Sequence, residues 1–305
     1  MITKFQRKIK SQYVLLIMLI PGVIYFVVFQ YIPMAGILLA FKSYSIRGGF
    51  FGSPWVGLDN FRFLLLSGKL WTVTRNTILY NLVFMVTTHL AAIFVAVFIS
   101  ELKGKRVKKV FHSILFLPYF ISYVILGVFV YNILSYEFGS LNAFLRAVGQ
   151  SPVNVYEQKW MWPGILAFFN LWKWIGYSSI IYLAVAVTID KQLYESATLE
   201  GASIWQRTWY ITLPNLLPTF VVIFLLQLGR IMRGQFDLFY NIIGNNSQLF
   251  EITDVVDTFV FRSLVYNFDI GMSTAAGLYQ SVFGLCIILF VNWLFRKLRP
   301  DMALF

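Results

Sequence analysis

The sequence predicts an all-α membrane protein with six transmembrane helices, and three observations support this. Of its 305 residues, 59% are hydrophobic and only 12% are charged, whereas soluble domains carry about 25% charged residues. Six apolar runs are each long enough to cross a bilayer as a helix. Lysine and arginine are concentrated in alternate loops between these runs. We expect the transmembrane helices at 14–41, 74–100, 110–134, 161–187, 215–235 and 272–295.

The charge distribution predicts that both the N and C termini are cytoplasmic. The two terminal tails, the 101–109 loop and the 188–213 loop together hold fourteen cations and five acids, while the other three loops hold eight of each. Positively charged loops stay in the cytoplasm. We therefore expect cytoplasmic tails at 1–13 and 296–305, on either side of a single transmembrane domain, 14–295.

The first run follows four cations, as the apolar part of a signal peptide does. It is too long for a signal peptide and no small-residue cleavage site follows, so we expect a membrane anchor. Prolines interrupt three of the expected helices, and each removes a backbone donor and bends its helix. Bends in three helices favour a moving bundle around a cavity over ordinary kinking. The prolines are Pro21, Pro33, Pro118, Pro214 and Pro218.

The cytoplasmic loop between the fourth and fifth helices is predicted to form a helix-turn-helix. Asp190 is a suitable N-cap for its first helix. Gly201 can adopt the positive φ that ends a helix. Ser203, followed three residues later by Gln206, matches the capping box that begins a second helix.

The second helix of this 188–214 loop has an apolar face that includes Trp205 and Trp209. We expect it to end at Pro214, where the fifth transmembrane helix begins. Two functions fit such a loop. It is either an amphipathic element at the lipid headgroups, with its tryptophans in the interface, or a docking element for a cytoplasmic partner.

The spacing within the 188–214 loop resembles the E-A-A-x3-G-x9-I-x-L-P signature of ABC-importer permeases. Serine replaces the first alanine, which is an exchange of one small residue for another. In that family the loop is the coupling helix, which sits in a cleft of the ATP-binding subunit. The resemblance implies an ATPase-coupling role for Glu195, Ser196, Ala197, Gly201, Ala202, Trp205, Ile211, Leu213 and Pro214.

Other segments are similar to those of the carbohydrate-uptake (maltose-type) permeases, specifically the first of their two unlike permease subunits. They include Val-Gly-Leu-Asp-Asn-Phe at 56–61 and Gly-Ser-Leu-Asn at 139–142. Segments 254–262 and 277–284 resemble the branch that imports complex oligosaccharides and polysaccharide fragments. The resemblance covers nearly the whole chain. It implies a heterodimeric permease in the bacterial plasma membrane, with a second unlike permease, two cytoplasmic ATP-binding subunits and an extracellular solute-binding protein.

The chain is not expected to be an enzyme. It contains no G-x-x-x-x-G-K-[ST] nucleotide-binding run, so ATP and Mg²⁺ are expected on the partner ATPase and no cofactor on this chain. One cysteine, Cys286, and two histidines, His89 and His112, are too few for a His/Cys metal cluster. The net charge of +12 is explained by the membrane-flanking loops, so no nucleic-acid partner is expected.

Residues of a sugar path should combine aromatic faces with amides and charges inside the helices. Gln227, Arg230, Gly234 and Asp237 recur at helical spacing and are expected to form one polar stripe on the fifth helix. The tryptophans also fit an interfacial aromatic belt, and the arginines also fit snorkelling to the surface. The candidate path residues are Asn170, Trp172, Lys173, Trp174, Gln227, Arg230, Asp237, Tyr279 and Gln280.

Two other functions compete with oligosaccharide import. The first is an ABC permease for another polar solute, such as an amino acid, a polyamine or phosphate, which would share the coupling loop but not the 56–61 and 139–142 segments. The second is a membrane-embedded enzyme or a receptor. The runs hold no paired aspartates, no serine–histidine combination on facing helices and no set of metal ligands, which disfavours an enzyme.

Overall fold

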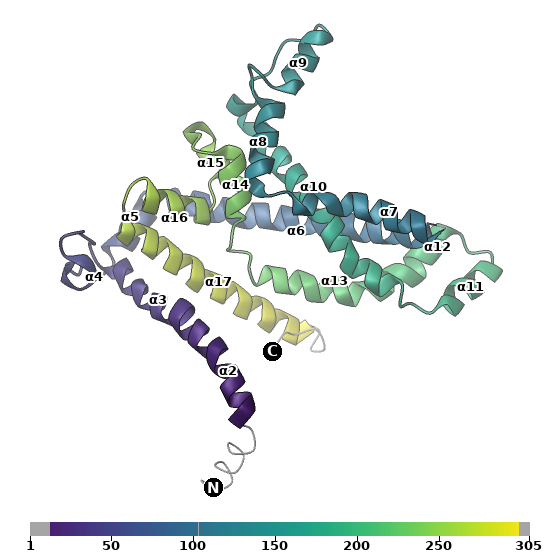
Figure 1. The fold of residues 1–305 in the computed structure, drawn as a ribbon, viewed down its shortest axis with the longest axis horizontal. Coiled ribbons are helices and arrows are strands. Elements are labelled where there is room, and N and C mark those ends of the chain that lie inside the picture. The colour runs from purple at the N-terminus through teal and green to yellow at the C-terminus, as the bar shows by residue number, and fades with distance from the viewer. Residues whose placement is uncertain (1–12, 103, 299–305) are drawn as a thin grey trace.

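The computed structural model describes residues 13–102 and 104–298, and this part of the chain is helical (Figure 1). It contains no strand, only an isolated antiparallel bridge between Lys42 and Trp55. Most of the expected tails, 1–13 and 296–305, lies outside the described residues. Within the described residues, four helices are long and apolar enough to cross a membrane, or six if each of two bent pairs forms one span. The all-α architecture is confirmed, while the number of spans and their orientation stay predictions.

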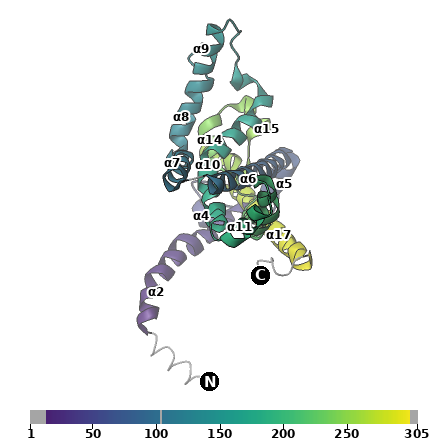
Figure 2. The ribbon, with the colours of Figure 1, turned by 90° about the vertical axis from the view of Figure 1, so that its right-hand side faces the viewer.

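The N-terminal stretch Tyr13–Phe41 projects away from the rest of the molecule at its beginning (Figures 1 and 2), while its end, Ala35–Phe41, packs against α17 (Ile270–Leu298). Its most apolar window has a mean hydropathy of 2.3, and none of that window is buried. Such a surface requires lipid or another apolar surface around it. The stretch consists of α2 (Tyr13–Phe26), a π-helix (Val27–Tyr31), α3 (Ile32–Met34) and a 3₁₀ helix (Ala35–Phe41).

Two long helices form the centre of the bundle. Short helices α4 (Gly49–Gly52) and α5 (Asp59–Leu66) lead into α6 (Lys69–Glu101), which packs along α10 (Trp162–Ala186). The 33 residues of α6 make it about 50 Å long. Their contact is sealed by fully buried side chains, which include Ala92, Ala96, Leu166 and Tyr182.

The expected third helix, 110–134, is sharply bent near Pro118. A short 3₁₀ turn separates α7 (Lys105–Phe116) from α8 (Tyr123–Leu134), and the two helices meet at 94°. Ser122 caps α8 by accepting a hydrogen bond from the Ile125 N–H. The carbonyls of residues 119 and 121, which the bend frees from helical bonding, accept hydrogen bonds from the Lys173 ammonium. The bend is therefore fixed by proline on one side and by lysine on the other.

Two groups of short helices lie on the side of the bundle where α8 lies. A first group of short helices, α9 (Ser140–Ala147) and two 3₁₀ turns, leads into α10. A second group follows the fifth helix and packs on α8 and α6 (Figure 1). It consists of α14 (Phe236–Ile243), α15 (Phe250–Thr253) and α16 (Val256–Val265), and the last helix is α17 (Ile270–Leu298).

The expected end of a helix at Pro214 is wrong. One continuous helical stretch runs from Ile204 to Leu228, made of α12 (Ile204–Arg207), a π-helix (Thr208–Thr212) and α13 (Leu213–Leu228). In the π-helix the Leu213 N–H donates to the Thr208 carbonyl, five residues back. The wider turn accommodates the proline that would clash in an α-helix. The 188–214 loop is thus joined to the fifth helix without a break.

The prediction of one polar stripe along the fifth helix is also wrong, because the helix is shorter than expected. The helix ends at Leu228, with Gly229 as its C-cap, and the next helix begins at Phe236. Arg230 and Gly234 therefore lie in an irregular segment, and Asp237 lies in the first turn of α14.

Candidate functional site

The 188–214 loop contains the two helices that its sequence predicts, α11 (Lys191–Leu199) and α12. An Asp190 carboxylate oxygen accepts from the Gln192 N–H at 2.9 Å and caps the first helix. Ser203 Oγ accepts from the Gln206 N–H, and Gln206 Oε1 accepts from the Ser203 N–H at 2.7 Å. Both expected caps are confirmed.

The turn between these helices requires glycine. Gly201 has a φ of +80°, in the left-handed region. The Ala202 N–H donates to the Ala197 carbonyl at 2.9 Å, and the Gly201 N–H donates to the Thr198 carbonyl at 3.0 Å. This is the Schellman arrangement, in which a left-handed residue satisfies the last helical carbonyls.

Side-chain contacts tie the 188–214 loop to itself and to α6. The Tyr194 hydroxyl lies 2.9 Å from the Thr212 hydroxyl. Arg207 donates to the Thr198 hydroxyl at 2.9 Å and lies 3.5 Å from the Glu101 carboxylate at the end of α6. The loop is therefore linked by side-chain contacts to α6 and by continuous backbone to the helix that follows it.

The loop presents apolar side chains outward. Leu199 is 90% exposed and Trp205 is 71% exposed, and Glu195 is exposed on the same loop. Of the other residues that resemble the coupling signature, Ala197, Ala202, Ile211 and Leu213 are half-buried, and Ser196, Gly201 and Pro214 are exposed.

A cavity of about 500 Å³ lies among α6, α8, α10, the end of α13 and the start of α14, and it is called the polar cavity after the amide and charged side chains that share its otherwise apolar wall. The structure brings together in it five of the nine candidate path residues. Its volume lies within the range of small-molecule sites. The five are Asn170, Trp174, Gln227, Arg230 and Asp237.

The other four candidate path residues do not line the cavity. The Trp172 ring is stacked on Phe129, and Lys173 binds the carbonyls at the α7–α8 bend. The Tyr279 hydroxyl lies 3.1 Å from the Thr74 hydroxyl. Gln280 donates to the Met232 carbonyl at 2.6 Å and to an Asp257 carboxylate oxygen at 3.1 Å. These contacts give each a structural role.

A buried chain of hydrogen bonds orients Gln227. The Tyr182 hydroxyl lies 2.7 Å from His89 Nδ1, and His89 Nε2 lies 2.9 Å from Gln227 Oε1. Because Gln227 Oε1 only accepts, a neutral His89 carries its proton on Nε2, and Nδ1 accepts from Tyr182. The Gln227 amino group is then available to the cavity as a donor.

Asn170 lines the same cavity. Its amide nitrogen donates to the Thr88 hydroxyl at 3.3 Å. Its Oδ1 is buried, is shielded from the cavity and has no hydrogen-bond partner among the described residues. An unpaired buried acceptor costs about 1–3 kcal/mol.

The irregular segment 229–235 is held by hydrogen bonds from three helices: α17, through the Gln280 contact with Met232, and α6 and α16. Asn81 donates to the carbonyls of Ile231 and Arg233, at 2.9 and 3.1 Å. The Gly234 N–H donates to an Asp257 carboxylate oxygen at 2.5 Å. Burial raises the pKa of Asp257 above its ordinary value, and the hydrogen bond from Gly234 partly offsets this.

Sequence reasoning missed several cavity residues because each is positioned by distant partners. The Trp174 indole N–H donates to the Tyr123 hydroxyl at 3.1 Å, and Tyr123 donates to Gln235 Oε1 at 3.3 Å. Asn81 gave a usable signal, since it is an amide within an apolar run. The missed residues that line the cavity include Asn81, Thr88, Tyr123, Arg233 and Gln235.

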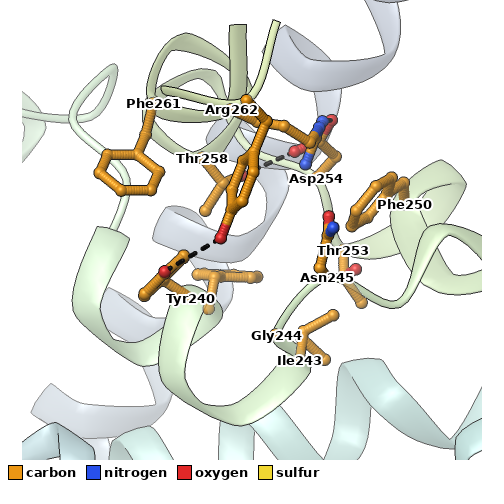
Figure 3. A pocket seen from close by; sticks show the side chains of 12 residues that line it. Tyr240, Ile243, Gly244, Asn245, Phe250, Thr253, Asp254, Thr258, Phe261 and Arg262 are labelled. Carbon is orange, nitrogen blue, oxygen red and sulfur yellow. Dashed lines mark hydrogen bonds and ion pairs between the residues drawn. The ribbon is translucent and has the colours of Figure 1, made fainter. Parts of the chain in front are cut away.

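A second, much smaller pocket lies between α14, α15 and α16 (Figure 3). Arg262 forms an ion pair with Asp254 and lies over the Phe250 ring. Burial raises the pKa of Asp254, and the neighbouring Arg262 opposes that rise. The pocket's volume of about 20 Å³ is too small for a sugar. The residues around it pack the 254–262 segment against α14.

Three comparisons with known proteins agree that this chain is similar to the membrane components of transport systems. Residues 89–300 match the family described as "Binding-protein-dependent transport system inner membrane component". A solved ABC transporter that imports the acidic polysaccharide alginate has a chain with a TM-score of 0.87 and 32% identity, covering 97% of this chain and 99% of that one. The polygalacturonan/rhamnogalacturonan transport system permease protein YteP of Bacillus subtilis is 30% identical, over 96% of this chain and 91% of its own length.

Protein LplB of Bacillus subtilis is 29% identical over 94% of this chain and 90% of its own length. The family match spans more than two thirds of the chain, and the structural likeness spans nearly all of it. The chain therefore belongs to the family of inner membrane components of binding-protein-dependent transport systems.

Proposed function

We propose that this chain is a permease subunit of an ATP-driven importer for oligosaccharides or polysaccharide fragments, in the bacterial plasma membrane. Its partners are a second, unlike permease, two cytoplasmic ATP-binding subunits and an external solute-binding protein. A related transporter structure includes alginate pentasaccharide bound to a periplasmic protein, which supports the last of these. The similar proteins transport sugars, which favours a sugar over an amino acid, a polyamine or phosphate.

The continuous helix from Ile204 to Leu228 is the observation that carries this proposal. It begins in the 188–214 loop and ends beside the polar cavity, which Gln227 lines. A helix of 25 residues is about 37 Å long. A displacement at the loop is therefore transmitted to the cavity wall by one continuous helical stretch.

The mechanism follows from this connection. ATP binding closes the two ATP-binding subunits, and the 188–214 loop docked on them moves with them. Arg207 passes the movement to α6 through Glu101, and α13 passes it to the cavity. ATP and the loaded binding protein shift the equilibrium between inward- and outward-facing states by their different affinities for the two states.

The cavity has the chemistry of a sugar site. Sugar hydroxyls both donate and accept hydrogen bonds. The Gln227 amino group provides a donor, and the Asp237 carboxylate on the cavity wall provides an acceptor. Trp174 and Tyr123 provide aromatic faces beside them. We infer that the second permease completes the wall of this cavity.

Uptake by the whole complex tests the proposal. The complex of both permeases and the ATP-binding subunits is reconstituted in proteoliposomes, and the binding protein is added with labelled substrate. We expect uptake of an oligosaccharide that requires ATP and is absent with a hydrolysis-deficient ATP-binding subunit. Uptake of a labelled amino acid or of phosphate, with no uptake of any oligosaccharide, would refute it.

A further inference from the structure

Two guanidinium groups, those of Arg230 and Arg233, line the polar cavity. Arg230 and Arg233 are both exposed and both border the cavity. Neither side chain makes a hydrogen bond or an ion pair within the described part of the chain. The carbonyl end of α13 stabilises a nearby cation. That accounts for one arginine beside this helix end and leaves the other unexplained.

The nearby carboxylates neutralise this pair only in part. Asp237 is the one acid that lines the cavity with them, and it lies in the first turn of α14, where a negative charge is stabilised by the helix. The Asp257 carboxylate does not line the cavity and accepts hydrogen bonds from the Gly234 N–H and from Gln280, although it also interacts electrostatically with Arg233. Among the residues that line the cavity, two positive charges therefore face one negative charge.

The backbone that carries both arginines is fixed. Asn81 binds the carbonyls on either side of Met232, Gln280 binds the Met232 carbonyl, and Asp257 binds the Gly234 N–H. Four hydrogen bonds from α6, α16 and α17 thus converge on four consecutive residues, 231–234. A ligand that binds the two side chains does not have to order this backbone, which reduces the entropic cost of binding.

We propose that this cavity selects anionic oligosaccharides, whose sugar carboxylates are bound by Arg230 and Arg233. This inference rests on the proposed function and narrows its substrate class to sugars that carry uronate groups. A guanidinium presents paired donors that match the two oxygens of a carboxylate. The aromatic faces of Trp174 and Tyr123, on the same cavity, take the apolar faces of the sugar rings.

Direct binding to the cavity tests the proposal without the binding protein, which has a specificity of its own. The complete membrane complex in nanodiscs is titrated with trigalacturonate and with its fully methyl-esterified form, and dissociation constants are measured by calorimetry. We expect the acid to bind about tenfold more tightly than the ester, since a charge-assisted hydrogen bond contributes about that factor. We expect added salt to weaken binding of the acid and not of the ester.

Variants assign the effect to the arginines. Arg230→Gln and Arg233→Gln should each reduce affinity for the acid about tenfold and leave affinity for the ester unchanged. Arg230→Lys should retain part of the preference for the acid over the ester. Asp237→Asn should tighten binding of the acid. Lys159→Gln is the matched control, because Lys159 pairs with Glu251 and does not line the cavity. Co-purification of the other subunits shows that each variant has assembled.

The outcomes separate this inference from the proposed function. Equal affinity for acid and ester, or glutamine variants with unchanged affinity for the acid, would overturn the charge selectivity. So would binding of neither probe while a neutral oligosaccharide is still taken up with ATP, a result that leaves the proposed function standing. Absence of ATP-dependent uptake of any oligosaccharide would overturn both.

Discussion

Replacing Gly201 with aspartate is expected to abolish co-purification of the ATP-binding subunits, while the chain still inserts and pairs with the second permease. Gly201 has a φ of +80°, where a residue with a Cβ is strained by about 1–2 kcal/mol. A Cβ there meets no atom within 4 Å, so the damage is not an internal clash. It is a distorted turn plus a new carboxylate on the docking surface, beside Glu200.

Two variants distinguish these causes. Gly201→Asn keeps the size of aspartate, tolerates the left-handed region better and adds no charge, so most of the ATP-binding subunit should be retained. Gly149→Asp is the matched control, since Gly149 has a φ of +77°, no atom within 4 Å of its Cβ position, and the same hydrogen-bond pattern after α9. Its complex should retain all ATP-binding subunits. A normal amount of ATP-binding subunit with Gly201→Asp would refute the docking role.

Replacing Arg207 with alanine is expected to leave docking intact and to uncouple ATP hydrolysis from uptake. Arg207 connects the 188–214 loop to α6 through Thr198 and Glu101. Hydrogen bonds of charged groups contribute about 1.5–3 kcal/mol, so the sugar imported per ATP hydrolysed should fall about tenfold. The measurement is simultaneous hydrolysis and uptake in proteoliposomes.

The partner residue and a nearby cation provide the controls for Arg207. Glu101→Gln should reduce coupling less than Arg207→Ala does. The double variant should lose little more coupling than Arg207→Ala alone, because both substitutions affect the same contact. Lys191→Ala, at an exposed cation of the same loop, should behave as wild type. Additive losses from Glu101 and Arg207, or unchanged coupling in the alanine variant, would contradict the role of this contact.

The 188–214 loop was predictable from sequence because its structure depends on local interactions. The Asp190 cap, the Gly201 turn and the Ser203–Gln206 capping box each involve residues a few positions apart. Such pairs leave a recognisable spacing in the sequence. The predicted end at Pro214 failed because a π-helix next to the proline accommodates it, and spacing alone does not reveal that accommodation.

The cavity was predictable only in part, because its geometry depends on residues distant in sequence. Gln227, Arg230 and Asp237 do face one cavity, although the helical stripe that grouped them does not exist. Lys173 was assigned to the path as an intramembrane charge. Its actual partners are carbonyls more than fifty residues earlier, freed by the bend at Pro118. No pattern near Lys173 encodes that contact.

Labelling of a cysteine at position 199 tests most directly whether the 188–214 loop is the cytoplasmic docking surface. Leu199→Cys, 90% exposed in the parent chain, is made in a Cys286→Ser background and treated with a membrane-impermeant maleimide. We predict labelling in inside-out vesicles stripped of the ATP-binding subunits, protection when those subunits are restored, and none in right-side-out vesicles. Labelling from the outside, or equal labelling with and without the ATP-binding subunits, would contradict the account.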